Sequence, residues 1–168
     1  MNDVFIERLI KRKLLPLCIA LRIISIILIL VSVLLVLQIG SLGVIIETIV
    51  CIGAFYIFKY TSIEYEYCYV AGEFIIDKVM GKAKRKRCIK IDMNTVELVA
   101  PVGHESINEY SNVKFETKNF TSRYNKDNEY VVFFRKDADL FKVIFEPDES
   151  IVKAMQMIAP RKVHIKNN

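Results

Sequence analysis

The strongest concentration of one chemical type in the chain is a short basic run. Five Lys and Arg side chains fall within six positions: Lys82, Lys84, Arg85, Lys86 and Arg87. From Tyr60 onward the chain has 18 basic and 16 acidic side chains, so without this run its C-terminal part would be net acidic. Positive charge confined to one place indicates one defined anionic contact and argues against a broad nucleic-acid surface.

The basic run predicts a contact with anionic membrane lipid. Such lipids attract basic side chains near the membrane surface by about 1 kcal/mol each. Two alternatives stay open: Lys and Arg that block pairing at an exposed sheet edge, and a simple determinant of membrane topology. A nucleic-acid or protein site is less favoured, because the run lacks the interleaved aromatic residues that single-strand binding uses.

Residues that perform catalysis or bind metals occur, but not at the spacing that these functions need. His104-Glu105 begins like a zinc-binding H-E-x-x-H motif, yet Asn108 takes the place of the second histidine. His164 lies in a terminal basic segment, and we expect both histidines to be polar loop or strand residues. The sequence has no phosphate-binding glycine motif, and its four cysteines form no C-x-x-C pair. We therefore predict no catalytic residue, no metal site, no cofactor and no enzyme activity.

Two long apolar segments precede the basic run. Leu14–Leu37 is almost continuous hydrocarbon, and Leu42–Phe58 is a second apolar segment after a short uncharged turn at residues 38–43. A bilayer span needs about 20 apolar residues, and a helical hairpin satisfies its backbone hydrogen bonds within lipid. We predict a transmembrane hairpin over residues 14–59. A cleaved signal peptide fits less well, because the first apolar segment is too long.

Basic residues flank these spans on one side. Residues 1–13 carry four of them, the turn carries none, and Lys59 and the basic run follow the second span. Because Lys and Arg favour the cytoplasmic side, we expect a multi-pass plasma-membrane protein with both termini in the cytoplasm. Cys68 and Cys88 should then stay reduced.

Two charged residues lie inside the predicted spans. Arg22 is near the cytoplasmic end of the first span, where its long side chain can reach the headgroups. Folding the hairpin about Gly40 places Arg22 opposite Phe58, and Glu47 opposite Val33. Glu47 is interpreted as a hydrated carboxylate near the outer interface, with a proton or ion site, or a contact between helices of an oligomer, as the alternatives.

Alternating apolar and polar residues predict a β-rich cytoplasmic domain over residues 60–168. Strands are expected at residues 63–70, 74–80, 88–93, 96–100, 130–135 and 140–145, with a weaker one at 113–120. After Glu146-Pro147 the period becomes helical, and a buried face is expected from Ile151, Val152, Met155 and Ile158. The predicted fold class is α+β: a transmembrane hairpin, then a mostly antiparallel domain closed by one amphipathic helix.

Three segments carry a resemblance to a known family. They are MNDVFIERLIKRK at the start, EYEYCYVAGEFIIDKVMGKAKRKR after the second span, and KVIFEPDESIVKAMQMIAPRKV at the end. With them the chain resembles an uncharacterised bacterial family of small two-span membrane proteins with a C-terminal pleckstrin-homology-like domain. The resemblance implies that fold and a membrane location, and it implies no mechanism.

These observations favour a membrane-anchored, non-enzymatic binding or scaffold module at the cytoplasmic face. Its expected contacts are anionic membrane lipid or a partner membrane protein, including a second copy of the chain, and no nucleic acid. The alternative is an accessory subunit of a transporter or envelope-stress complex, which would act through the hairpin and Glu47. A function that follows the basic run supports the first hypothesis, and one that follows Glu47 supports the second.

Overall fold

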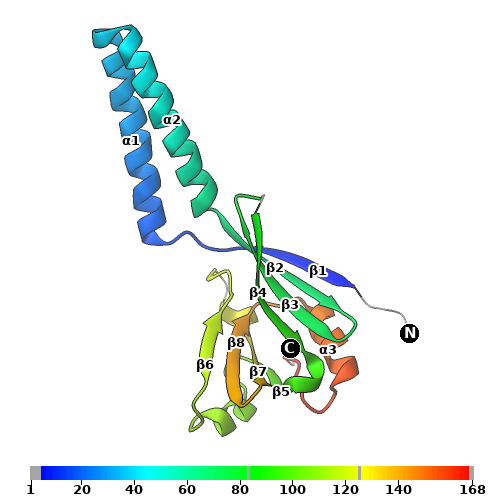
Figure 1. The fold of residues 1–168 in the computed structure, drawn as a ribbon. Helices are drawn as coiled ribbons and strands as arrows, with labels where there is room; N and C mark the ends of the chain where they lie inside the picture. The colour runs from blue at the N-terminus through cyan, green and yellow to red at the C-terminus, as the bar shows by residue number, and fades with distance from the viewer. Residues whose placement is uncertain (1–4, 83, 125, 167–168) are drawn as a thin grey trace. The chain divides into compact units, whose positions relative to one another are not determined.

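The computed structural model of the protein describes residues 5–82, 84–124 and 126–166. These residues form two compact units, and Figure 1 shows their elements along the chain. One unit contains Lys13–Ile63 and Met80–Lys84, and so holds the two apolar helices and a short turn. The other is built from the chain before Lys13, from Glu64–Val79 and from the chain after Lys84.

The first unit is a helical hairpin with a very tight reversal. Helix α1 (Pro16–Ile39) and helix α2 (Ser41–Thr61) are both long and apolar enough to cross a membrane, which indicates a membrane protein. Gly40 alone joins them and has a φ of 64°, a conformation that glycine adopts without strain. The prediction of two spans is confirmed. The predicted turn at residues 38–43 is wrong in length, because this single glycine reverses the chain.

Small residues let the two helices of the hairpin approach closely. A Cβ atom at Gly43 would lie 2.5 Å from the Cα of Val36, so no side chain fits there. Ser25, Ser32 and Ala54 are the other buried residues of the pair. Small side chains at a contact between apolar helices are typical of packing in membranes, where close backbone approach supplies the attraction.

The second unit begins with a four-stranded sheet in the order β1-β2-β3-β4. Its strands are β1 (Ile6–Lys11), β2 (Ile63–Val70), β3 (Glu73–Met80) and β4 (Lys84–Asp92). Strand β1 was not predicted: it pairs antiparallel with β2, so that Ile6 lies opposite Tyr69. The segment is short, contains three charged residues, and pairs with a strand that follows both helices in the chain. Its local sequence therefore gives little indication of a strand. Strand β4 begins four residues before the predicted position, so most of the basic run lies in a strand.

A second four-stranded sheet has the order β5-β7-β8-β6. Its strands are β5 (Val96–Pro101), β6 (Glu116–Asn119), β7 (Tyr130–Lys136) and β8 (Asp139–Phe145). The turn between β7 and β8 is tight, and β6 pairs parallel with β8. The stretch before β6 holds a 3-10 helix, η2 (Glu105–Tyr110), and another, η3 (Lys126–Asn128), follows it.

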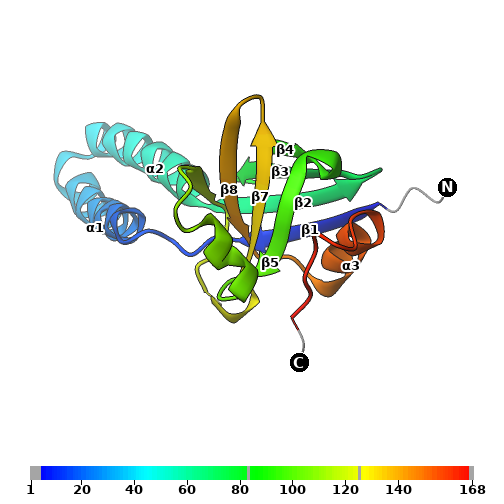
Figure 2. The same cartoon turned by 90° about the horizontal axis from the view of Figure 1, so that it is seen from below.

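The main core lies between the two sheets, whose strands cross one another in Figure 2. Tyr67 is fully buried, and its hydroxyl donates to the Phe120 carbonyl at 2.8 Å and accepts from the Glu146 amide at 3.2 Å. The rings of Phe74 and Phe145 meet with centroids 4.9 Å apart. Aromatic side chains with satisfied polar ends therefore join the sheets.

The C-terminal helix α3 (Glu149–Ile158) packs beside this core. Asp148 caps it by accepting the amide of Ile151 at 3.1 Å. Its buried residues are Ile151, Val152, Ala154 and Met155. The prediction of a buried face holds for three of its four residues and is wrong for Ile158, which is 51% exposed at the end of the helix.

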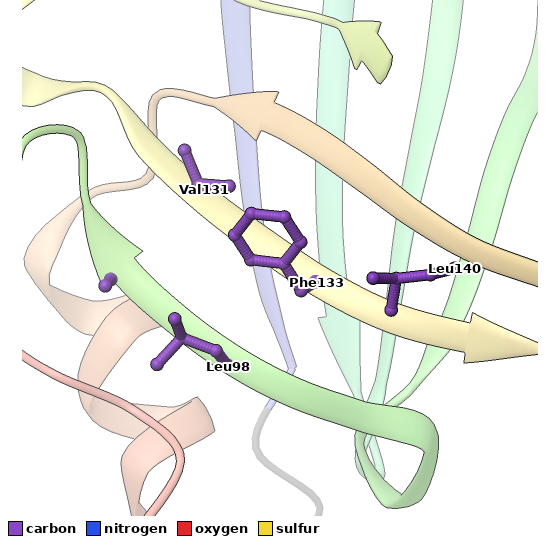
Figure 3. Close-up of a cluster of buried hydrophobic side chains, with 5 residues drawn as sticks. Leu98, Val131, Phe133 and Leu140 are labelled. Carbon is purple, nitrogen blue, oxygen red and sulfur yellow. The ribbon is translucent and has the colours of Figure 1, made fainter. Parts of the chain in front are cut away.

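A smaller apolar cluster lies on the other face of the second sheet. Figure 3 shows Leu98, Val131, Phe133 and Leu140 gathered there. Tyr110 of η2 stacks on Phe133 with ring centroids 4.3 Å apart. The segment between β5 and β6, which contains η2, therefore covers an apolar face of the sheet.

Candidate functional site

The basic run occupies the turn after β3 and the first half of β4. Lys82 lies in the turn with a φ of 58°, and Lys84, Arg85, Lys86 and Arg87 begin the strand. All five side chains are exposed. Strand β4 is an edge strand of its sheet, where Lys and Arg side chains can block pairing with another strand.

The turn that starts the basic run is attached to the end of helix α2. The backbone amide of Gly81 donates to the carbonyl of Ser62 at 3.1 Å. A Cβ atom at Gly81 would lie 2.9 Å from the carbonyl oxygen of Lys59, and its φ of 56° also favours glycine. Lys59, Lys82 and Lys84 therefore belong to the same compact unit as the hairpin.

Arg22 closes the same end of the hairpin. Its guanidinium donates to the hydroxyls of Thr61 and Ser62, both at 2.9 Å, and to the carbonyl of Phe58 at 3.3 Å. The guanidinium also lies 5.1 Å from the centre of the Phe58 ring. Arg22 is opposite Phe58, as predicted, and it satisfies carbonyl and hydroxyl oxygens at the C-terminal end of α2, where a cation is favoured.

The two arginines of the run have acidic partners on two other strands of the sheet, the adjacent β3 and the more distant β2. Arg85 forms an ion pair with Glu66 of β2 at 3.0 Å, and Arg87 approaches Asp77 of β3 at 3.6 Å. The three lysines of the run form no ion pair with any described residue. The five predicted contact residues therefore divide into two paired arginines and three lysines with free charges.

Glu66 is the most unusual partner in this arrangement. Its side chain is 4% exposed although it lies on the polar side of β2. The loss of hydration and the nearby Glu7 carboxyl raise the pKa of Glu66 to about 7, against the opposing effect of Arg85. Glu7, Glu66 and Asp77 together line a cavity of about 210 Å³ that Arg85 and Arg87 also border.

Glu47, the second charged residue of the spans, makes its contacts inside the hairpin. The hydroxyl of Ser32 on α1 donates to one carboxylate oxygen, and the thiol of Cys51 donates to the other at 3.3 Å. Ser32 is the neighbour of Val33, the residue predicted to lie opposite Glu47. The carboxylate therefore joins α1 to α2 within one chain.

The two histidines, far apart in the sequence, meet in the structure. Their rings stack with centroids 4.6 Å apart. His104 accepts the Ser106 amide at 3.3 Å, and the His164 amide donates to the Val99 carbonyl at 2.8 Å. The contact holds the C-terminal segment beside β5. Among the described residues no group of three His, Cys, Asp or Glu side chains is arranged to hold a metal ion.

The acidic partners of the basic run were not predicted from the sequence. Neither Glu66 nor Asp77 is among the site residues that the sequence predicts. Opposite charge on neighbouring strands is a signal that could have found Asp77, because such cross-strand pairs are common in sheets. Glu66 lies two strands away from Arg85, so this signal does not reach it. Without the strand order, however, no partner could be assigned.

Comparison with protein families agrees with this architecture. The profile of one family, described as a bacterial PH-like domain (DUF6106), matches residues 2–165 and so includes β1, the hairpin and both sheets. Searches of the curated proteins and of the solved structures found no significant match. Because the family profile extends over nearly the whole chain, the chain belongs to the bacterial PH-like domain family.

Proposed function

We propose that the protein is a membrane-anchored, non-enzymatic binding module on the cytoplasmic face of the plasma membrane, where the basic run contacts anionic lipid. PH-like domains are typically non-enzymatic and commonly bind lipids or proteins, and two apolar helices supply an anchor here. The assignment of anionic lipid as the partner depends on the position of the basic run and on its lysines that form no ion pair with a described residue.

The attachment of the turn to α2 is the observation that carries this proposal. The Gly81–Ser62 hydrogen bond ties the turn to the residue that directly follows the helix. A helix that crosses the bilayer ends near the headgroups, so Lys82 and Lys84 would lie at that level. Lys59 and Arg22 add cations to the same end of the hairpin.

Charge within the run supports the lysines as the main lipid contacts. Arg85 and Arg87 already face Glu66 and Asp77, which reduces their attraction for another anion. The three lysines have no such counter-charge among the described residues. Lys84 and Lys86 also lie on an edge strand, so lipid contact and edge protection can act together.

Strand pairing supports the proposed topology. Strands β1 and β2 hydrogen-bond to each other, although α1 and α2 lie between them in the chain. In a chain whose hairpin crosses the bilayer, these strands must therefore lie on one side and Gly40 on the other. The basic residues that flank the spans favour the cytoplasm for the strands.

The alternative function, an accessory subunit that acts through Glu47, has less support. The carboxylate already accepts the Ser32 hydroxyl, so it has a donor without a second protein. A buried polar group in lipid needs such a partner, and here the hairpin supplies it. Glu47 therefore supports a structural role within the hairpin.

Lipid binding by the full-length protein tests the proposal. The protein is purified in mild detergent and titrated with phosphatidylglycerol, and bound lipid is counted by native mass spectrometry. We expect the variant with Lys82→Gln, Lys84→Gln and Lys86→Gln to bind about 100-fold more weakly at low salt, as an upper limit, because three charges contribute about 3 kcal/mol. Raised salt should weaken binding by the parent protein.

A variant with the same loss of charge is the control. Lys114→Gln, Lys126→Gln and Lys153→Gln remove three exposed lysines that lie outside the run. This control should bind phosphatidylglycerol like the parent protein. Equal binding by the run variant and the parent would overturn the lipid contact and favour edge protection. Stable retention of one partner protein, lost only in the run variant, would replace lipid by protein as the contact.

A further inference from the structure

A second cluster of basic side chains lies within the second compact unit. It does not include Lys82, Lys84 or Lys86, the proposed lipid contacts. Four cationic side chains line a cavity of about 270 Å³. They are Arg87 and Lys90 of β4, Lys118 of β6 and Lys136 of β7. No carboxylate is among the described residues that line this cavity. Cations from both sheets therefore converge on one space, although the domain around them is nearly neutral.

Acidic side chains balance only part of the positive charge around this cavity. Lys90 and Lys118 have partners outside its lining, Glu73 at 2.7 Å and Glu116 at 3.3 Å. The ion pair of Arg87 with Asp77 is longer, at 3.6 Å, than that of Arg85 with Glu66 at 3.0 Å, so it balances the charge of Arg87 only in part. Lys136 forms no ion pair with any residue that the structure describes. An anion in the cavity would relieve the mutual repulsion of these side chains.

Two aromatic side chains form one side of the cavity and make that side apolar. Phe134 and Phe141 stack with ring centroids 5.4 Å apart, and Phe134 is only 2% exposed. The Nζ atom of Lys118 lies 5.3 Å from the centre of the Phe141 ring. An apolar wall excludes water from one side, so an anion interacts more strongly there than on an open surface.

We infer that this cavity binds a phosphate group, carried either by a lipid headgroup or by a soluble ligand. Phosphate offers several charged oxygens to donors that arrive from different strands, and Arg and Lys are its usual protein partners. The volume admits one small headgroup or metabolite and no polymer. The site does not depend on the proposed lipid contact of Lys82, Lys84 and Lys86, because its cations are other residues of both sheets.

Alkylation of Cys88 in the full-length protein tests the inference, because this thiol lines the cavity. The protein is placed in phosphatidylcholine nanodiscs, and the alkylation rate of each cysteine is followed by peptide mass spectrometry. Glycerol phosphate is added in one arm, with chloride at equal ionic strength as the reference. In the other arm the nanodisc contains phosphatidic acid. A bound phosphate should slow alkylation of Cys88 about tenfold at ten times its dissociation constant.

Two variants and an internal reference make the result specific. Lys118→Gln with Lys136→Gln should abolish the protection, whereas Lys126→Gln with Lys153→Gln should keep it. Cys68 lines the other cavity and should not respond. Protection by glycerol phosphate supports a soluble ligand, and protection only by phosphatidic acid supports a headgroup. No protection in either arm, or equal protection in the Lys118/Lys136 variant, overturns the inference. Loss of lipid binding by the Lys82/Lys84/Lys86 variant would leave this result unchanged.

Discussion

At the scale of single residues, Glu66 is unusual because it is a buried carboxyl on the polar side of β2. It is 4% exposed, and its pKa is raised to about 7 by lost hydration and by the nearby Glu7 carboxyl. A carboxyl with a raised folded-state pKa favours folding while it is protonated. Its contribution is fully present below the unfolded pKa, near 4.5, and is lost as the pH rises through about 7.

Replacing Glu66 by Gln should remove this pH dependence. We expect Glu66→Gln to be more stable than the parent at pH 8, by on the order of 2 kcal/mol, and to lose the difference near pH 4.5. Arg85 is 66% exposed, so the loss of its partner costs little. Thermal melting followed by near-ultraviolet circular dichroism from pH 4.5 to 8 measures the effect. Glu64→Gln on the same strand is the control, and identical profiles for both variants would contradict the role of Glu66.

At the scale of elements, the packing of α3 can be tested with two methionines on one helix. Met155 is 1% exposed and Met157 is 79% exposed. Met155→Asp should destabilise the domain by more than about 3 kcal/mol, because it removes a buried side chain and buries an unpaired charge. Met157→Asp should change stability by less than about 0.5 kcal/mol. Chemical denaturation compares them, and equal losses would mean that α3 does not pack as described.

At the scale of the whole molecule, pairing of β1 with β2 makes the hairpin an insertion within a sheet. The proposed topology places Gly40 outside and both strands inside. In a chain whose four native cysteines are replaced by Ala, an impermeant thiol reagent should label Ser41→Cys in intact cells. Lys126→Cys should react only after the cells are opened. Labelling of Lys126→Cys in intact cells would reverse the orientation. Position 168, the C-terminal residue, lies outside the described residues, so Lys126 reports for the domain.

Patterns that repeat over many residues were readable from the sequence alone. The two spans, most strands of the domain and helix α3 follow from local hydrophobic period, which needs no knowledge of distant partners. The position of Arg22 opposite Phe58 followed from the same reasoning, because a hairpin about Gly40 leaves little choice of register. The basic run was identified directly from the sequence, because five of six consecutive residues are Lys or Arg.

What only the tertiary structure decided is which distant residues meet. The strand β1 exists because β2 offers it an edge, and its own sequence signal is weak. The pairing of Arg85 with Glu66 required the strand order, and the contact of Ser32 with Glu47 required the rotation of both helices. The cavity of Lys118 and Lys136 required two sheets to pack. Contacts of this kind depend on three-dimensional packing, which local periodicity does not encode.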